Sequence, residues 1–258
     1  MRVLFIGDVV GSPGRQGLRE TMPQLRERHA PDLVIVNGEN SAGGMGITER
    51  TANDLFGAGT DVITTGNHVY RHREAYGFLE NSDRVIRPAN YPQGNPGRGH
   101  TIVEVGGMRV RVINLSGAVG LRVARSPFDT VDSILSHHEQ DAVIVDFHAE
   151  VTSEKVAMGW HLDGRAGAVF GTHTHVPTAD GRVLPGGTAF ITDVGMTGSR
   201  TSVLGVKPEQ ALQSLITQMP TRFETAEEDV WVMGALVDVN ERGLADSFEQ
   251  VLAPAAGP

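Results

Sequence analysis

The feature that most constrains the fold is a set of short apolar runs, each of which ends in polar residues. The runs are "RVLFIGD", "DLVIVNGEN", "DVITTGNH", "AVIVDFHAE" and "AGAVFGTHTH", and their β-branched and aromatic residues are typical of buried strands. Stretches with helix start and stop signals separate the first three runs. Because strands that alternate with helices are typical of βαβ units, the sequence up to residue 68 predicts an α/β fold with a parallel sheet.

Three later segments are typical of antiparallel hairpins. Residues 101–117, 181–195 and 231–252 each contain two alternating runs around a glycine-containing turn. The run "RVRVINL" could pair between chains, which makes a homo-oligomer one hypothesis. No repeat or linker divides the sequence, so we predict a single domain over residues 1–258, with the last five or so residues frayed.

Local signals also mark the helices. Thr48 and Ser126 are predicted N-caps, and Pro127 suits the first position of the helix that follows Ser126. The helical segment that begins at Ser126 is expected to run to residue 138. Pro23 lies within the helical stretch 14–30 and is expected to kink or split it.

Composition excludes several kinds of site and partner. The chain has no cysteine, so any metal must be held by oxygen and nitrogen ligands. Its formal net charge of −9 argues against long nucleic acid as a partner. We expect no membrane association, because no apolar run is long enough to span a bilayer. The short N-terminal run carries Asp8 and does not resemble a signal peptide, which favours the cytoplasm.

The polar residues that follow the strands form a set with metal-binding character. The carboxyl ends of parallel strands lie along one edge of a sheet, where ligands commonly bind. We expect this set to meet there: Asp8, Glu39, Asn40, Asn67, His68, His148, His173 and His175. Carboxylates, carboxamides and imidazoles together suit divalent iron or manganese, with zinc as an alternative.

The set is larger than one ion requires, so we predict two divalent ions about 3.5–4 Å apart. We expect Glu39 to bridge them, with Asp8, Asn40 and His175 on one ion and Asn67, His148 and His173 on the other. His173 and His175, at positions i and i+2 of a strand, should share one face. Two ions contribute +4 and the two carboxylates remove 2, so a net of about +2 would attract a phosphate and favour a bridging hydroxide.

His68 adjoins a predicted ligand and is expected to reach the substrate as the general acid, while the bridging hydroxide attacks phosphorus. Each residue also has a structural interpretation: Asp8 could cap a helix, Asn67 could form an Asx-turn and His68 could cap its own turn. The loop 41–48 could bind a phosphate through its backbone N–H groups or be a simple turn. Asp146 could orient an imidazole or be a surface carboxylate.

Five motifs together resemble the calcineurin-like metallophosphoesterase superfamily, and within it the YmdB-type bacterial phosphodiesterases. They are "GDVVG" (7–11), "NGEN" (37–40), "TTGNH" (64–68), "DFHAE" (146–150) and "GTHTH" (171–175), and "TDVGMTG" (192–198) adds to the likeness. The resemblance covers nearly the whole chain. It implies an α/β/β/α sandwich of mixed sheets, a metal site at the carboxyl ends of the strands, and hydrolysis of a small phosphodiester such as a 2′,3′-cyclic nucleotide.

The chain departs from the superfamily pattern at two positions. Val10 stands where the superfamily usually has histidine, and Val69 where a carboxylate often follows Gly-Asn-His. Another group must therefore orient His68. The motifs leave two alternatives open: a phosphomonoesterase with the same metals, and a metal-stabilised signalling or interaction protein.

Overall fold

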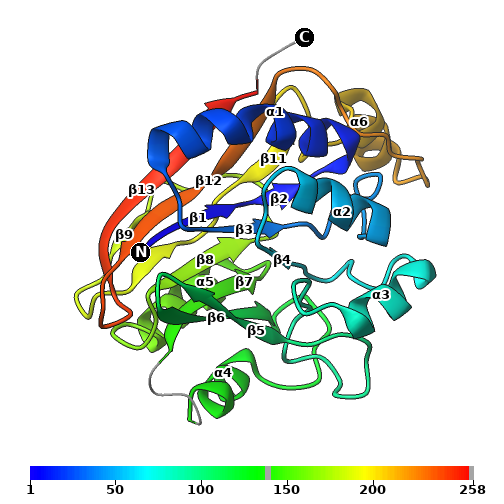
Figure 1. Cartoon of the computed structure of the whole chain (residues 1–258). Coiled ribbons are helices and arrows are strands. Elements are labelled where there is room, and N and C mark those ends of the chain that lie inside the picture. Colours follow the sequence, from blue (N-terminus) through cyan, green and yellow to red (C-terminus); the bar gives the residue numbers. More distant parts are fainter. Residues whose placement is uncertain (137–140, 256–258) are drawn as a thin grey trace.

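The computed structural model describes residues 1–136 and 141–255, in which two mixed sheets lie face to face (Figure 1). The first sheet contains β1 (Arg2–Ile6), β2 (Asp8–Val9), β3 (Leu33–Asn37), β4 (Val62–Thr64), β11 (Met196–Ser199), β12 (Val230–Val239) and β13 (Ala245–Pro254). The second contains β5 (His100–Val105), β6 (Met108–Ser116), β7 (Ala142–His148), β8 (Ala168–Thr172), β9 (Arg182–Val183) and β10 (Ala189–Ile191). The helices are α1 (Gly11–His29), α2 (Glu49–Gly57), η1 (Arg73–Ala75, a 3-10 helix), α3 (Tyr76–Asn81), α4 (Pro127–Leu135), α5 (Thr152–His161) and α6 (Pro208–Thr217).

Each sheet has a parallel centre to which antiparallel strands are added. In the first sheet β1, β3 and β4 are parallel, and β12 runs antiparallel to β1. In the second sheet the order is β5-β6-β7-β8-β10-β9, and only the edge strands β5 and β9 are antiparallel to their neighbours. The three predicted hairpins are confirmed as β5–β6, β9–β10 and β12–β13.

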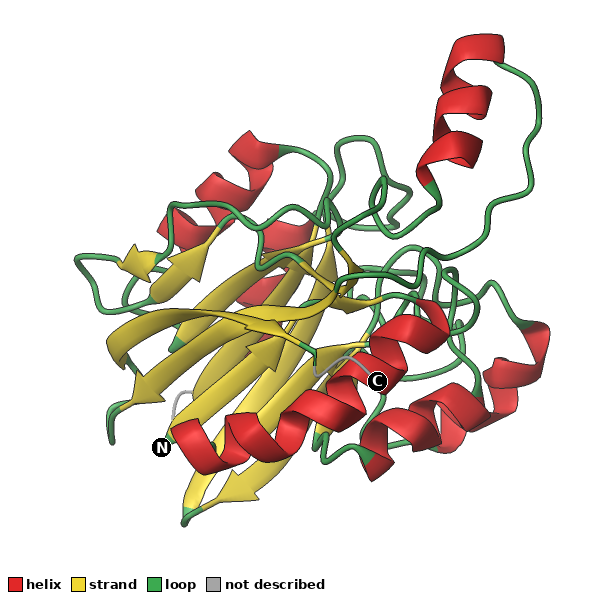
Figure 2. Cartoon of the chain, turned by 90° about the horizontal axis from the view of Figure 1, so that it is seen from above, coloured by secondary structure: helices red, strands yellow, loops and turns green. Residues whose placement is uncertain are grey.

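Strand alternation produces a core in three layers. In β1, Val3 and Phe5 point toward the second sheet, where Phe5 stacks on Phe170 with ring centroids 4.6 Å apart. The alternate residues Leu4 and Ile6 face the opposite side and pack with α1, α2 and α3. The outer face of the second sheet packs against α4 and α5. This arrangement is the predicted α/β/β/α sandwich, and Figure 2 shows α6 standing out from it.

The predicted helix starts are confirmed. Thr48 and Thr51 form a reciprocal capping box at the start of α2, and the Ser126 side chain accepts from the Asp129 backbone N–H at the start of α4. Residues 137 and 138, the expected end of this segment, lie outside the described residues. Among the residues that are described, no helix combines the length and apolar character needed to cross a bilayer.

Three expectations are wrong. The expected split of the helix at Pro23 does not occur, because that residue and Arg19, whose carbonyl loses its usual partner, are exposed to water. The run "RVRVINL" lies in β6, which pairs with β5 and β7 on its two sides, so it cannot join a second chain. Within the expected frayed tail, Pro254 pairs with Trp231 and Ala255 donates to Val230, because the β12–β13 ladder extends that far; residues 256–258 lie outside the described part.

Candidate metal centre

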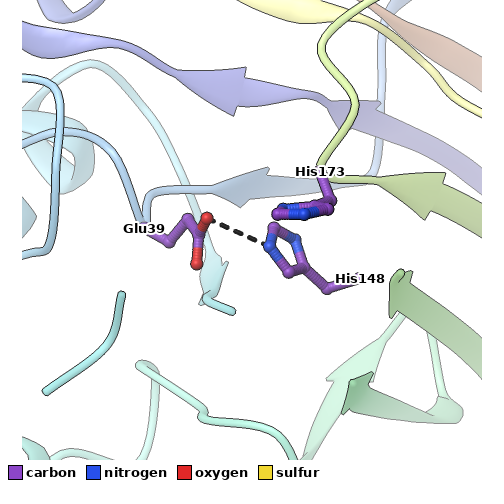
Figure 3. Close-up of side chains that lie close together, drawn as sticks. All are labelled: Glu39, His148 and His173. Atoms are coloured by element: carbon purple, nitrogen blue, oxygen red, sulfur yellow. Dashed lines mark ion pairs between the residues drawn. The ribbon is translucent and has the colours of Figure 1, made fainter. Parts of the chain in front are cut away.

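All eight predicted site residues lie together where the loops leave the carboxyl ends of the strands. Asp8 begins β2, Glu39 and Asn40 follow β3, Asn67 and His68 follow β4, His148 ends β7, and His173 and His175 follow β8. Figure 3 shows Glu39, His148 and His173 pointing toward one another from three of these segments. Segments far apart in the sequence thus contribute to one cluster.

The first group of side chains surrounds His148. Its Nε2 atom is 3.0 Å from Glu39 Oε1 and 3.0 Å from Asn67 Oδ1. The His173 ring lies edge-on to the His148 ring, with centroids 4.6 Å apart. One ligand atom from each of Glu39, His148 and His173 lies within 4.8 Å of the others, which is close enough for one cation to contact all three.

The second group surrounds Asp8. His175 Nε2 lies 3.6 Å from Asp8 Oδ1, and Asn40 Nδ2 lies 3.1 Å from the same histidine nitrogen. Asn40 Nδ2 is also 3.4 Å from Glu39 Oε1. A single carboxylate oxygen, Glu39 Oε1, therefore faces both groups.

Close packing around Glu39 explains the glycine of "TTGNH". A Cβ atom on Gly66 would lie 2.3 Å from Glu39 Oε2 and 2.3 Å from His148 Nε2. A side chain there would overlap both of these atoms. Glycine at this position therefore allows the turn after β4 to approach the cluster.

The turn that carries His173 and His175 differs from the prediction. Strand β8 ends at Thr172, and the two histidines have positive φ angles of 96° and 66°. They occupy a turn, so the expectation that they share one face of a strand is wrong. Tertiary hydrogen bonds hold this backbone: the N–H of His173 donates to Asp8 Oδ2 at 3.1 Å, and the N–H of Thr174 donates to Asp193 Oδ2 at 3.1 Å.

Burial and neighbouring charges shape the protonation of the cluster. Burial opposes ionisation of Asp8 and Glu39, but His175 and His148 outweigh it and lower the pKa of each carboxyl. Burial also lowers the pKa of His148, yet the Glu39 carboxylate raises it overall to about 9. At His175 the Asp8 carboxylate outweighs burial and raises the pKa. At His173 burial and the neighbouring His148 together lower the pKa.

These shifts fit a site built for cations. Two fully buried carboxylates, Asp8 and Glu39, face the imidazoles of His175 and His148, and positive charge on this side favours the ionised form of each carboxyl. A divalent cation would supply such a charge, because imidazole binds metal in its neutral form. The oxygen and nitrogen donors of the cluster therefore suit a metal without any thiolate.

His68 is oriented by the residues that follow β3. Its Nδ1 atom is 2.8 Å from Asn40 Oδ1, and its backbone N–H donates to Glu39 Oε2 at 3.1 Å. These contacts supply the orienting group that the sequence left unidentified. Asn40 turns its amide nitrogen toward the cluster, and a carboxamide binds a cation through oxygen. Its amide must therefore rotate before Asn40 can act as a ligand.

A buried relay behind His148 was only partly foreseen. Asp146 is fully buried, so its interpretation as a surface carboxylate is wrong, and burial raises its pKa to about 6. Thr172 Oγ1 donates to Asp146 Oδ1 at 2.7 Å and accepts from His148 Nδ1 at 2.9 Å. This arrangement places the ring proton on Nδ1 and leaves Nε2 for a metal.

We expect Thr172→Val to weaken metal binding about 10- to 100-fold, because the His148 N–H loses its acceptor without a change in side-chain shape. Calorimetric titration of the metal-free protein with Mn²⁺ measures the change. Thr188→Val is the matched control, since Thr188 is equally buried and bonds only to backbone groups away from the cluster. Equal affinity in the two variants would exclude the relay.

A second buried network holds the histidine turn and was not anticipated. Lys155 Nζ donates to Asp193 Oδ2 at 2.8 Å, and Thr174 Oγ1 donates to the same oxygen at 2.6 Å. The Lys155 and Asp193 side chains are 1% and 0% exposed. Asp193 and Glu150, which lies 2.9 Å from His173 Nε2, both belong to recognised motifs, but their partners are distant in sequence.

We expect Lys155→Met to lower the free energy of unfolding by about 3–5 kcal/mol, because it leaves the Asp193 carboxylate buried without its cation. Urea denaturation of the metal-free protein measures the loss. Lys207→Met provides the control for removal of a lysine, since the Lys207–Glu224 pair is exposed and should contribute little. Similar losses in both variants would contradict the special role of the buried pair.

Comparisons with known proteins agree with this geometry. Residues 4–251 match the family model described as YmdB-like protein. The chain is 46% identical over 244 residues to 2′,3′-cyclic-nucleotide 2′-phosphodiesterase of Bacillus subtilis (strain 168), covering 94% of this chain and 92% of the relative.

Two crystal structures are also similar along the whole chain. A hypothetical protein from Thermus thermophilus has a TM-score of 0.94 at 41% identity, with 99% of this chain and 100% of the other covered. A novel phosphatase from Mycoplasma pneumoniae has a TM-score of 0.94 at 33% identity, with coverages of 100% and 95%. The resemblance carried by the sequence motifs is therefore confirmed, and this chain belongs to the YmdB-like family of metallophosphoesterase-type proteins.

Proposed function

We propose that this protein is a dinuclear-metal phosphodiesterase that hydrolyses nucleoside 2′,3′-cyclic phosphates. One observation carries the proposal: Glu39 Oε1 faces both groups of side chains, 3.0 Å from His148 Nε2 in the first and 3.4 Å from the amide of Asn40 in the second. A shared carboxylate of this kind suits the bridge between two ions. The named activity of the Bacillus subtilis relative, at 46% identity, supports the choice of substrate.

We assign the proposed ligands to two ions according to the group around Asp8 and the group around His148. Asp8, Asn40 and His175 would hold one ion and Asn67, His148 and His173 the other, with Glu39 common to both. We propose iron or manganese, with zinc as the alternative, because the donors are oxygen and imidazole nitrogen. When bound, such ions would neutralise the phosphate charge and lower the pKa of a coordinated water.

In this proposal the side chains of the protein position the substrate and donate a proton to the leaving oxygen. In hydrolysis the oxygen of water forms a new bond to phosphorus, a ribose oxygen leaves, and that oxygen must gain a proton. His68 Nδ1 faces Asn40, and the side chain is 30% exposed, which leaves Nε2 for the leaving oxygen. We assign His68 as the general acid and place the reaction in the cytoplasm.

Two measurements test the proposal together. Elemental analysis of the purified protein should give about two metal equivalents per chain, as the shared carboxylate implies. Steady-state hydrolysis of adenosine 2′,3′-cyclic phosphate should be much faster than hydrolysis of adenosine 3′-phosphate. Faster cleavage of the monoester would instead identify a phosphomonoesterase. Absence of both activities in the metal-loaded protein would leave the signalling or interaction role.

A further inference from the structure

A cavity of about 500 Å³ lies between loops that also carry residues of the candidate metal centre. Its walls come from the loop after β3, the loop after β4, the loop before α6 and the segment after α6. We propose that this cavity binds the nucleoside part of the substrate, with the base stacked on Phe223. The inference rests on the proposed function, because it assumes that the phosphate lies at the metal centre.

One sequence proximity and two hydrogen bonds connect the cavity to the candidate metal centre. Ala42 lines it and lies two positions after Asn40 in the loop that follows β3. Arg71 also lines it, and its backbone N–H donates to the carbonyl of His68 at 2.9 Å. Leu204, on the opposite wall, accepts from His175 Nδ1 at 3.0 Å. The cavity is therefore lined by the segments that carry or contact Asn40, His68 and His175.

Part of the lining consists of exposed apolar side chains, on which a base can pack. Phe223 is 48% exposed, Leu204 48% and Met45 39%, although large apolar side chains gain from burial. Exposed apolar residues that gather around one cavity indicate a binding surface. An aromatic ring at such a position can stack on a nucleobase of any identity.

Polar groups at the rim suit the remainder of a nucleoside. Among the described residues, none of the ion pairs involves the exposed guanidinium of Arg71, which leaves its N–H groups free for carbonyl or ring-nitrogen acceptors of a base. The hydroxyls of Thr221 and Thr225 also line the cavity. A volume of about 500 Å³ lies within the usual range for small-molecule sites.

The wall formed by the loop after β3 is held in place. His72 Nε2 is 2.9 Å from the carbonyl of Met45. A Cβ on Gly46 would lie 2.7 Å from Arg71 Cβ, and the φ angle of Gly46 is +89°, so glycine allows this loop to pack on the next one. Residues 41–48 therefore form one wall of the proposed substrate cavity, and this role does not depend on phosphate binding by their backbone N–H groups.

The test compares two five-membered cyclic phosphodiesters, one with a nucleoside and one without. Adenosine 2′,3′-cyclic phosphate carries a base, whereas glycerol 1,2-cyclic phosphate offers the same five-membered ring without one. For Phe223→Ala we expect the ratio of kcat/KM between these substrates to fall about tenfold through KM, because base stacking is lost. Phe223→Trp should preserve the ratio. Trp160→Ala removes an aromatic residue of similar exposure outside the cavity and should not change it.

A second readout is independent of turnover. Calorimetric titration with adenosine 3′-phosphate should show about tenfold weaker binding to Phe223→Ala than to the unaltered protein, whereas titration with inorganic phosphate should show no difference. An unchanged ratio and unchanged nucleotide affinity would overturn the proposal. If the unaltered protein hydrolysed neither cyclic substrate, the proposed function would fail, and the titration would still decide whether the cavity binds a nucleoside.

Discussion

Glu39→Gln should lose most of its bound metal and at least about 10³-fold in kcat/KM for a 2′,3′-cyclic nucleotide. The substitution preserves side-chain shape but removes the charge of the oxygen that faces both donor groups, 3.0 Å from His148 Nε2 and 3.4 Å from Asn40 Nδ2. Elemental analysis should fall from about two equivalents to one or fewer. The same sample assayed on adenosine 2′,3′-cyclic phosphate measures the loss of rate.

Glu154→Gln is the matched control for this experiment. Glu154 is also a buried glutamate, and its carboxylate accepts from the backbone N–H groups of Ala118 and Val119 instead of facing the cluster. This control should retain its full metal content. Two equivalents and normal activity in Glu39→Gln would remove the bridging carboxylate from the proposal.

His68→Gln should keep its metal and lose about 10²- to 10⁴-fold in kcat on the cyclic nucleotide. The imidazole faces Asn40 through Nδ1, and its backbone N–H, which donates to Glu39, is unaffected by the substitution. A ribose alkoxide needs a proton as it leaves. Bis-p-nitrophenyl phosphate releases a stable phenolate, so the loss of rate on that substrate should be much smaller.

Two comparisons make this result decisive. His161→Gln changes the histidine at the end of α5, which pairs with Asp132 of α4 away from the cluster, and should leave both rates unchanged. Equal losses on the two substrates in His68→Gln would exclude proton donation to the leaving group. A parallel loss of metal would instead identify His68 as part of the cation site.

Much of the fold could be predicted because its signals are local. The alternation in 231–252 and 101–117 defined hairpins, and the side chains of Thr48 and Ser126 defined helix starts within one turn of chain. The residues directly after β1, β3, β4, β7 and β8 could be assigned to one edge because strand direction decides where a chain leaves a sheet.

The failures share a different cause. Continuation through Pro23 depends on exposure of that helix face, and the pairing of Pro254 depends on a strand more than 20 positions earlier. The turn at His173 is held by Asp8, 165 residues away in the sequence. In each case a tertiary contact or solvent exposure overrides a local preference.

The amino-acid sequence by itself determined which side chains reach the strand ends and that these are carboxylates, carboxamides and imidazoles, because apolar periodicity and residue chemistry are local properties. Only the tertiary structure decided that Glu39 lies between two groups, that Thr172 and Asp146 orient His148, and that the Lys155–Asp193 pair holds the histidine turn. The physical reason is that burial and pairing of these polar groups arise from distant segments that meet at one edge of the two sheets, where each group must find a hydrogen-bond partner.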